Sequence, residues 1–167
     1  KILYKLNNEG LVSTINAIFL KIKLIFKIKE FTVIKEFRSE SDDGDYPKVV
    51  SSFINDNRKF KNFKRNNFYR RILEHVSYEQ GKEYIKVIQR DNPQFIDEIE
   101  KFKFNDIIGN PYKFDYPQTG IISPTTLRYL KVASDLKKIF GNIGGEIAEI
   151  GCGYGGQFLI LDKIFSF

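Results

Sequence analysis

The sequence predicts a mixed α/β fold that is mostly helical, in which a helical N-terminal region leads into a strand, a glycine-rich loop and a helix. Three observations support this prediction. Apolar residues recur every three or four positions between residues 48 and 104, the spacing of helices that share a core. A cluster of glycines at 151–156 lies between a short β-compatible run and a second helical run. Apolar residues and tyrosine make up 42% of the chain, enough to bury a core.

The composition of the 167-residue chain excludes several classes of protein. Because it has one cysteine, Cys152, and one histidine, His75, neither an intrachain disulfide nor a zinc site made only of Cys and His can form. The longest uncharged stretches span 11 and 12 residues, whereas a membrane-spanning helix needs about 20. We therefore expect a reducing, cytoplasmic compartment. The absence of methionine, and an apolar pattern still running at 160–167, predict that the chain is a fragment.

The net charge of +6 comes from the N-terminal half. Lys and Arg minus Asp and Glu gives +5 for residues 1–38, −4 for 39–46, +6 for 47–75 and −1 for 76–167. Cations alternate with aromatic residues at 58–71, a mixture suited to stacking bases and neutralising phosphates. Helices that bury their aromatic residues and expose their cations produce the same pattern. Because the second half is nearly neutral, no nucleic-acid partner is expected.

The charge and the apolar pattern divide the chain into four regions. These are 1–38, a basic apolar segment; 39–47, an acidic linker; 48–122, a helical region; and 123–167, the start of the domain that carries the glycines. In the first region helical and strand-like spacings conflict, which favours a packing helix over an amphipathic helix in peripheral contact with a membrane. In the helical region, Asn92 is expected to cap a helix starting at Pro93, and 112–122 is expected to be an ordered loop.

The clearest helix follows Ser123, which supplies the N-cap. Pro124 occupies the first helical position, and Gly141 comes after a basic last turn. The free N–H groups at such a helix start also suit an anion. Ser123 and Thr125, with Arg128 one turn later, are therefore candidates to bind a carboxylate or phosphate of a ligand.

The glycines at 151–156 carry the chemistry of the chain. The run before them predicts a strand at 146–150, and the apolar run after them predicts a helix. The backbone between strand and helix must turn tightly and let a ligand lie against bare main chain. Gly151, Gly153 and Gly156 match the dinucleotide spacing G-x-G-x-x-G, so the glycines alone do not select a cofactor. We expect this to be the start of an incomplete Rossmann-like domain.

Glu149 favours one class of cofactor. It precedes Gly151 by two residues, at the predicted carboxyl end of the strand, where its charge would repel a pyrophosphate. S-adenosylmethionine has an ammonium and a sulfonium group and no phosphate, so a carboxylate at this position attracts it.

Several stretches of the sequence resemble a known family. Residues 148–157 (AEIGCGYGGQ) resemble motif I of the class I S-adenosylmethionine-dependent methyltransferases. Together with 120–129 (GIISPTTLRY), 107–111 (IIGNP) and 75–81 (HVSYEQG), they are similar to the sugar O-methyltransferases of bacterial surface-polysaccharide loci. The likeness extends back to about Tyr46.

This resemblance implies methyl transfer from S-adenosylmethionine to a hydroxyl of a sugar acceptor, either nucleotide-linked or part of a glycan. The residues expected at the cofactor are Glu149, Gly151, Cys152, Gly153, Gly155, Gly156 and Gln157, together with Ser123, Thr125 and Arg128. No metal is implied. The acid that reaches the ribose hydroxyls is expected about 20 residues after the glycines, past Phe167. No catalytic residue is therefore assigned, and the chain alone is expected to be inactive.

Two other functions stay open at this point. A nicotinamide-dependent oxidoreductase uses the same glycine spacing, and residues 1–75 suit a non-enzymatic module that binds nucleic acid or an anionic membrane. Individual side chains also have two explanations. Tyr116 and Tyr154 either cover a cofactor or pack in the core, His75 suits packing better than base catalysis, and small size alone explains Cys152.

Overall fold

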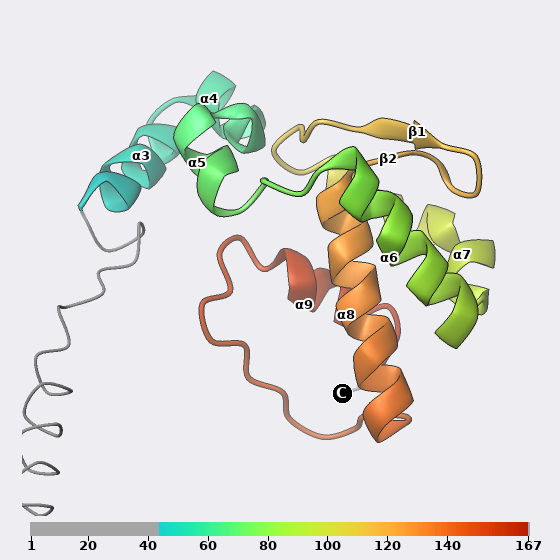
Figure 1. Ribbon diagram of the computed structural model, residues 1–167. Helices are drawn as coiled ribbons and strands as arrows, with labels where there is room; N and C mark the ends of the chain where they lie inside the picture. The colour runs from blue at the N-terminus through green and yellow to red at the C-terminus, as the bar shows by residue number, and fades with distance from the viewer. Residues whose placement is uncertain (1–43, 167) are drawn as a thin grey trace, which may run out of the picture. The chain divides into compact units, whose positions relative to one another are not determined.

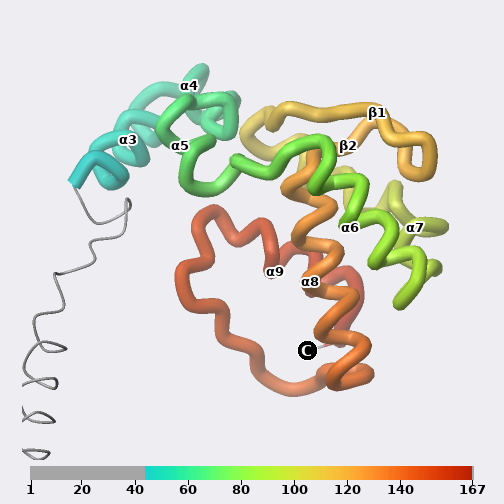
Figure 2. Tube along the Cα trace, in the orientation of Figure 1, coloured from blue at the N-terminus to red at the C-terminus, as the bar shows by residue number. Residues whose placement is uncertain are grey.

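The computed structural model describes residues 44–166 (Figures 1 and 2). Contacts divide the chain into Lys1–Ser39 and Glu40–Phe167, and the described residues belong to the second unit. The predictions for 1–38 lie outside them. The described elements are α3 (Asp45–Ile54), α4 (Asn57–Lys61), η1 (Phe63–Arg65), α5 (Asn67–Ile72), α6 (Tyr78–Asp91), α7 (Gln94–Asp97), η2 (Ile99–Lys101), η3 (Lys103–Asp106), β1 (Phe114–Tyr116), β2 (Gly120–Ile122), α8 (Pro124–Phe140) and α9 (Gly156–Leu161).

Helix α8 forms as the sequence predicts. The hydroxyl of Ser123 accepts a hydrogen bond from the Thr126 N–H at 3.1 Å, Pro124 is the first helical residue, and Gly141 follows the last one. These signals are local, because a helix makes its backbone hydrogen bonds within itself. The predicted N-cap role of Ser123 is confirmed.

Helices α6 and α8 form the main core of the described part of the chain (Figure 1). A Cβ atom on Gly81 would lie 2.2 Å from the Tyr116 hydroxyl, so only glycine allows α6 to approach the hairpin this closely. The buried apolar residues of this core are Ile85, Ile88, Phe95, Ile99, Phe102, Tyr116, Ile122, Leu127, Leu130, Ala133, Ile160, Leu161 and Phe165.

A second, smaller cluster consists of aromatic side chains from α3, η1 and α5. Phe53, Phe63 and Tyr69 are buried in it, and the partly buried Leu73 and Tyr154 pack against it. The rings of Phe63 and Tyr69 meet edge to face, with centroids 5.0 Å apart. This geometry is the favourable one for two aromatic quadrupoles.

The segment 112–122 is a hairpin, and the prediction of a loop was wrong. Strands β1 and β2 pair antiparallel, with Phe114 opposite Ile122 and Tyr116 opposite Gly120. Each strand has only three residues. Such short strands give too few alternations for a pattern to be visible in the sequence.

Two predicted boundaries also differ from the structure. Helix α3 begins at Asp45, inside the predicted linker 39–47, after Gly44 in a left-handed conformation with φ of 83°. Asn92 does not cap the next helix, because its side-chain amide donates instead to the Ser134 hydroxyl at 2.8 Å. Helix α7 is consequently short and is followed by turns of 3₁₀ helix.

Residues 146–150 do not form a strand, so this prediction was wrong. They lie in a long irregular segment that leaves the end of α8 and leads to α9 (Figure 2). A strand needs a neighbour to satisfy its N–H and C=O groups. Among residues 44–166 the two strands of the hairpin pair only with each other. The described part of the chain is thus mostly helical with one small antiparallel sheet, and the mixed α/β class is confirmed only in that sense.

Between residues 44 and 166, no helix combines the length and apolar character that crossing a bilayer requires.

Candidate functional site

The predicted glycine-rich segment, residues 151–156, adopts backbone conformations that require glycine. Gly151, Gly153 and Gly155 have φ values of 75°, 57° and 80°, in the left-handed region that other residues rarely adopt. No atom lies within 4 Å of a Cβ placed on Gly151 or Gly155, so these two glycines leave open space above the main chain. Gly156 differs, because it is buried against the Tyr154 and Tyr129 rings at the start of α9.

Glu149 lies just before this segment and is partly buried. Its Oε2 atom is enclosed and has no hydrogen-bond partner among residues 44–166. An enclosed carboxylate oxygen without a donor is unfavourable, and a cationic group beside it would relieve the cost. Cys152 is exposed, and its thiol donates to the neighbouring Gly153 carbonyl at 3.8 Å. Among residues 44–166 no hydrogen bond or ion pair joins this thiol to a base or a cation that would activate it.

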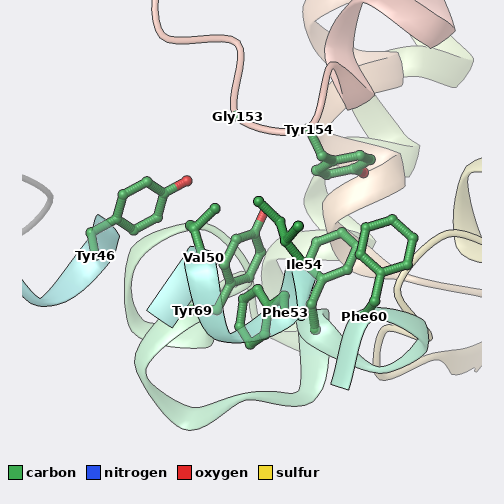
Figure 3. Close-up of a pocket in the computed structure, with 9 residues that line it drawn as sticks. Tyr46, Val50, Phe53, Ile54, Phe60, Tyr69, Gly153 and Tyr154 are labelled. Carbon is green, nitrogen blue, oxygen red and sulfur yellow. The ribbon is translucent and has the colours of Figure 1, made fainter. Parts of the chain in front are cut away.

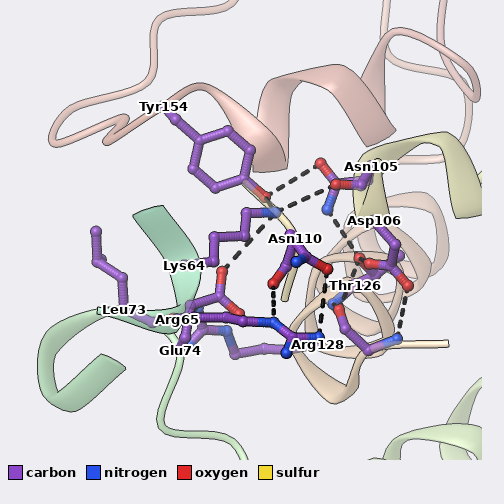
Figure 4. Close-up of polar contacts among 11 residues, drawn as sticks. Lys64, Arg65, Leu73, Glu74, Asn105, Asp106, Asn110, Thr126, Arg128 and Tyr154 are labelled. Atoms are coloured by element: carbon purple, nitrogen blue, oxygen red, sulfur yellow. Dashed lines mark hydrogen bonds and ion pairs between the residues drawn. The ribbon is translucent and has the colours of Figure 1, made fainter. Parts of the chain in front are cut away.

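Tyr154 joins the glycine-rich segment to the helical region (Figure 4). Its hydroxyl accepts a hydrogen bond from Lys64 Nζ at 2.6 Å and donates one to Asn105 Oδ1 at 3.1 Å. Lys64 also donates to the Asn105 carbonyl at 3.2 Å. Tyr154 therefore packs in place, and burial raises the pKa of its hydroxyl far above the ordinary value.

The same network continues to the start of α8. The Asn105 amide donates to the Thr126 hydroxyl at 2.8 Å, and that hydroxyl donates to Asp106 Oδ1 at 2.6 Å. The Ser123 N–H donates to the other Asp106 oxygen, also at 2.6 Å. The buried Asp106 carboxylate thus supplies the negative charge that the positive end of the helix attracts. The position expected for an anion of a ligand is taken by the chain itself.

Lys64 and Glu74 are a buried, oppositely charged pair in this network. Their side chains are 1% and 6% exposed, and Lys64 Nζ lies 3.9 Å from Glu74 Oε1. Burial lowers the pKa of Lys64 to about 8, against the attraction of the Glu74 and Asp106 carboxylates. Burial likewise raises the pKa of Glu74, against the attraction of Lys64. We call the connected residues Lys64, Glu74, Asn105, Asp106, Ser123, Thr126 and Tyr154 the buried polar network.

The other predicted ligand residues of α8 and α9 contact protein groups. Thr125 is buried, and its side chain acts to lower the pKa of Glu74 against the larger effect of burial. Arg128 donates through Nη2 to the Leu73 carbonyl at 3.1 Å, and the Gln157 amide donates to the Tyr129 carbonyl at 3.1 Å. These contacts hold α8, α9 and the end of α5 together. The structure therefore separates Ser123, Thr125, Arg128 and Gln157, which make internal contacts, from Glu149 and the open glycines.

Tyr116 and His75, two further candidates in the sequence, both lie away from the glycine-rich segment or make contacts of their own. Tyr116 is buried and donates to the Tyr78 carbonyl at 3.3 Å, so it packs in the main core and does not cover the glycine-rich segment. His75 is exposed beside the Ile72 carbonyl, with 3.1 Å between Nδ1 and the oxygen. Within residues 44–166, no three His, Cys, Asp or Glu side chains come close enough to hold a metal ion.

A pocket of about 120 Å³ lies between the aromatic cluster and the glycine-rich segment (Figure 3). We call it the aromatic pocket. It is lined by Tyr46, Val50, Phe53, Ile54, Phe60, Phe63, Tyr69, Gly153 and Tyr154. Neither this pocket nor the partners of Tyr154 could be predicted from the sequence, because they join residues about 50 to 100 positions apart. The only early signal was the run of aromatic residues and cations at 58–71.

Comparisons with known proteins give no match to this chain, whether to family models, to curated proteins or to solved structures. The likeness to methyltransferases therefore depends on the motif residues alone.

Proposed function

We propose that the chain contributes the donor-binding part of an S-adenosylmethionine-dependent O-methyltransferase that acts on a sugar hydroxyl. One observation carries the proposal: the exposed left-handed glycines of segment 151–156 directly follow a carboxylate that has an enclosed, unpaired oxygen. In this proposal segment 151–156 is the glycine-rich loop of a Rossmann-like donor-binding domain. The setting would be surface-polysaccharide synthesis in the cytoplasm.

The residues fit a cationic, phosphate-free ligand. Glu149 offers negative charge where a diphosphate would be repelled. Gly151 and Gly155 leave room for a ligand to lie on the main chain. When bound, S-adenosylmethionine supplies an electrophilic methyl group on its sulfonium.

This part of the chain binds and orients the donor. Holding the donor in one position converts a bimolecular encounter into a reaction within one complex, which is a large part of the rate enhancement for a direct displacement. Lys64 and Asn105 fix Tyr154, and through it they fix the end of the glycine-rich segment. The anchored segment then keeps its shape when a ligand arrives, which lowers the entropy lost on binding.

Isothermal titration calorimetry of this chain with S-adenosylmethionine, S-adenosylhomocysteine and NADH tests the proposal. We expect the two adenosyl compounds to bind and NADH not to bind. Glu149→Gln should weaken S-adenosylmethionine binding about tenfold, because a buried hydrogen-bonded charge contributes about 1.5–3 kcal/mol. Glu146→Gln, an exposed acid three residues earlier, is the matched control and should leave affinity unchanged. Binding of NADH without either adenosyl compound would refute the proposal and favour an oxidoreductase.

A further inference from the structure

The aromatic pocket has walls suited to a flat ring. Five aromatic side chains from α3, α4, η1 and α5 line it, together with Tyr154. Phe60 and Ile54 at its edge are 55% and 73% exposed, although both are large and apolar. Exposed aromatic side chains beside a pocket large enough for one aromatic ring are typical of a ligand site rather than of a closely packed core.

The hydroxyl of Tyr69 is a polar group without a hydrogen-bond partner among residues 44–166. Tyr69 is 3% exposed, and its hydroxyl makes no hydrogen bond with any residue in 44–166. Among residues 44–166, the side-chain oxygens that are both fully enclosed and unpaired belong to Glu74 and Glu149. The Tyr69 hydroxyl is unpaired but is not fully enclosed, so a ligand can still reach it. Figure 3 shows this hydroxyl directed to the side of the pocket where Tyr154 lies. A ligand with a ring nitrogen or carbonyl would satisfy it.

Positive charge lies next to the aromatic pocket. A neighbouring hollow shares Phe53 with it and is lined by Asp56, Arg58, Lys59, Asn62, Arg65 and Asn66, three of which are cations. Arg58 in α4 is exposed and has no ion-pair partner among the described residues. Asp56 caps the N-terminus of α4, where its carboxylate accepts hydrogen bonds from the Arg58 and Lys59 N–H groups. With three cations and one acid, the neighbouring hollow carries net positive charge, which favours an anionic group there.

We propose that the aromatic pocket binds the base of a nucleoside diphosphate, with its phosphates beside the α4 cations. Three features recognise such a ligand: stacking on aromatic side chains, a hydrogen bond donated by the Tyr69 hydroxyl to a ring atom, and attraction of phosphate by the cations. Because Gly153 and Tyr154 form one wall of the pocket, this ligand lies against the glycine-rich segment. Resting on the proposed function, the inference makes the acceptor a nucleotide-linked sugar rather than a polymer.

Calorimetric titration of the whole chain with ADP, GDP, UDP and CDP, without any methyl donor, tests the pocket. We expect at least one diphosphate to bind with a dissociation constant below about 1 mM, and its parent nucleoside to bind at least tenfold more weakly. S-adenosylhomocysteine should not displace it. Displacement would assign the pocket to the adenine of the donor and overturn the inference, as would absence of binding by all four. If the chain binds a nucleoside diphosphate but does not bind S-adenosylhomocysteine, the result would support nucleotide binding in the aromatic pocket and refute the proposed function.

Three substitutions assign the binding to the pocket. Phe60→Ala should weaken binding tenfold or more through lost stacking, whereas Phe114→Ala, an exposed aromatic residue of β1, should not. Lys59→Ala should weaken the diphosphate but not the nucleoside. Its control is Lys86→Ala, since both lysines pair with an acid three residues earlier.

The third substitution is Tyr69→Phe, which should weaken binding about three- to tenfold, the value of one hydrogen bond. The melting temperature should not fall, because the hydroxyl has no partner within residues 44–166. Tyr84→Phe, in α6, is the control. Full affinity in both Phe60→Ala and Tyr69→Phe would place the ligand elsewhere and overturn the inference.

Discussion

The start of α8 and the glycine-rich segment 151–156 both offer main-chain N–H groups to a partner, but they are built in opposite ways. At α8 the Ser123 N–H and the Thr126 hydroxyl are buried and bonded to Asp106. Around Gly151 and Gly155 the main chain is open, and no neighbouring atom approaches a Cβ position. Tyr154 connects the two regions, because its hydroxyl belongs to the buried polar network.

This difference shows how to separate structural polar groups from those available to a ligand. Most groups of the buried polar network have partners within the chain, so the network fixes how the helices pack. The Glu149 oxygen and the Tyr69 hydroxyl lack partners among residues 44–166. Substitutions in the first set should change stability, and substitutions in the second set should change binding.

The largest effect is expected from Asp106→Ala. It leaves the Ser123 N–H and the Thr126 hydroxyl without their acceptor and removes the negative charge at the start of α8. We expect the free energy of unfolding in urea to fall by about 3 kcal/mol. Asp106→Asn keeps one acceptor oxygen and should lose about half as much, which keeps the comparison measurable if the alanine variant does not fold. Asp97→Ala, an exposed acid in α7, should change stability by less than about 0.5 kcal/mol.

The pH dependence of stability should show the lowered pKa of Lys64. Its pKa is about 8 in the folded chain and 10.5 when unfolded, so between these values the unfolded chain holds more protons. Stability from this group therefore rises with pH, by about 1.5 kcal/mol between pH 8 and pH 9.5. Above pH 10 the trend reverses, because burial raises the pKa of Tyr116 to about 12 and the unfolded tyrosine loses its proton first.

Urea unfolding at several pH values measures this trend. The reference is the double variant Lys64→Met/Glu74→Leu, in which apolar side chains of similar size replace the buried pair without leaving one charge unpaired. The rise should disappear in this variant. An equal rise in both chains would assign the effect to other groups and contradict the lowered pKa of Lys64.

The smallest change in stability is expected at the glycines. Gly151 and Gly145 both have positive φ values, 75° and 90°, and both have open space around the Cβ position. Alanine at either position should lower stability by the same amount, about 1 kcal/mol. Only Gly151→Ala should weaken S-adenosylhomocysteine binding, as measured by calorimetry. Equal affinity in the two variants would show that the glycine-rich segment does not hold the ligand.

The parts of the fold predicted correctly are those whose signals are local. The N-cap, the proline and the final glycine of α8 act on neighbouring residues, so they are visible in the sequence. The failed strand at 146–150 depends on partners elsewhere in the chain, and no local pattern supplies these. The hairpin was missed for the related reason that its register joins two very short strands.

The candidate site divides in the same way. Residue type alone predicts that Gly151, Gly153 and Gly155 allow unusual backbone angles, and the structure confirms the left-handed values. The contacts of Lys64 with Tyr154 and of Asp106 with Ser123 are long-range or depend on packing, so the sequence gives no sign of them. The assignment to S-adenosylmethionine remains a prediction.

The close approach of Gly81 to Tyr116 limits how this protein can vary. A methyl group at position 81 would collide with the tyrosine hydroxyl and would also lie 3.3 Å from Pro124 Cβ. Any larger residue at position 81 is therefore disfavoured unless a smaller side chain replaces Tyr116. We therefore expect homologous sequences to keep glycine at position 81 wherever position 116 is a tyrosine.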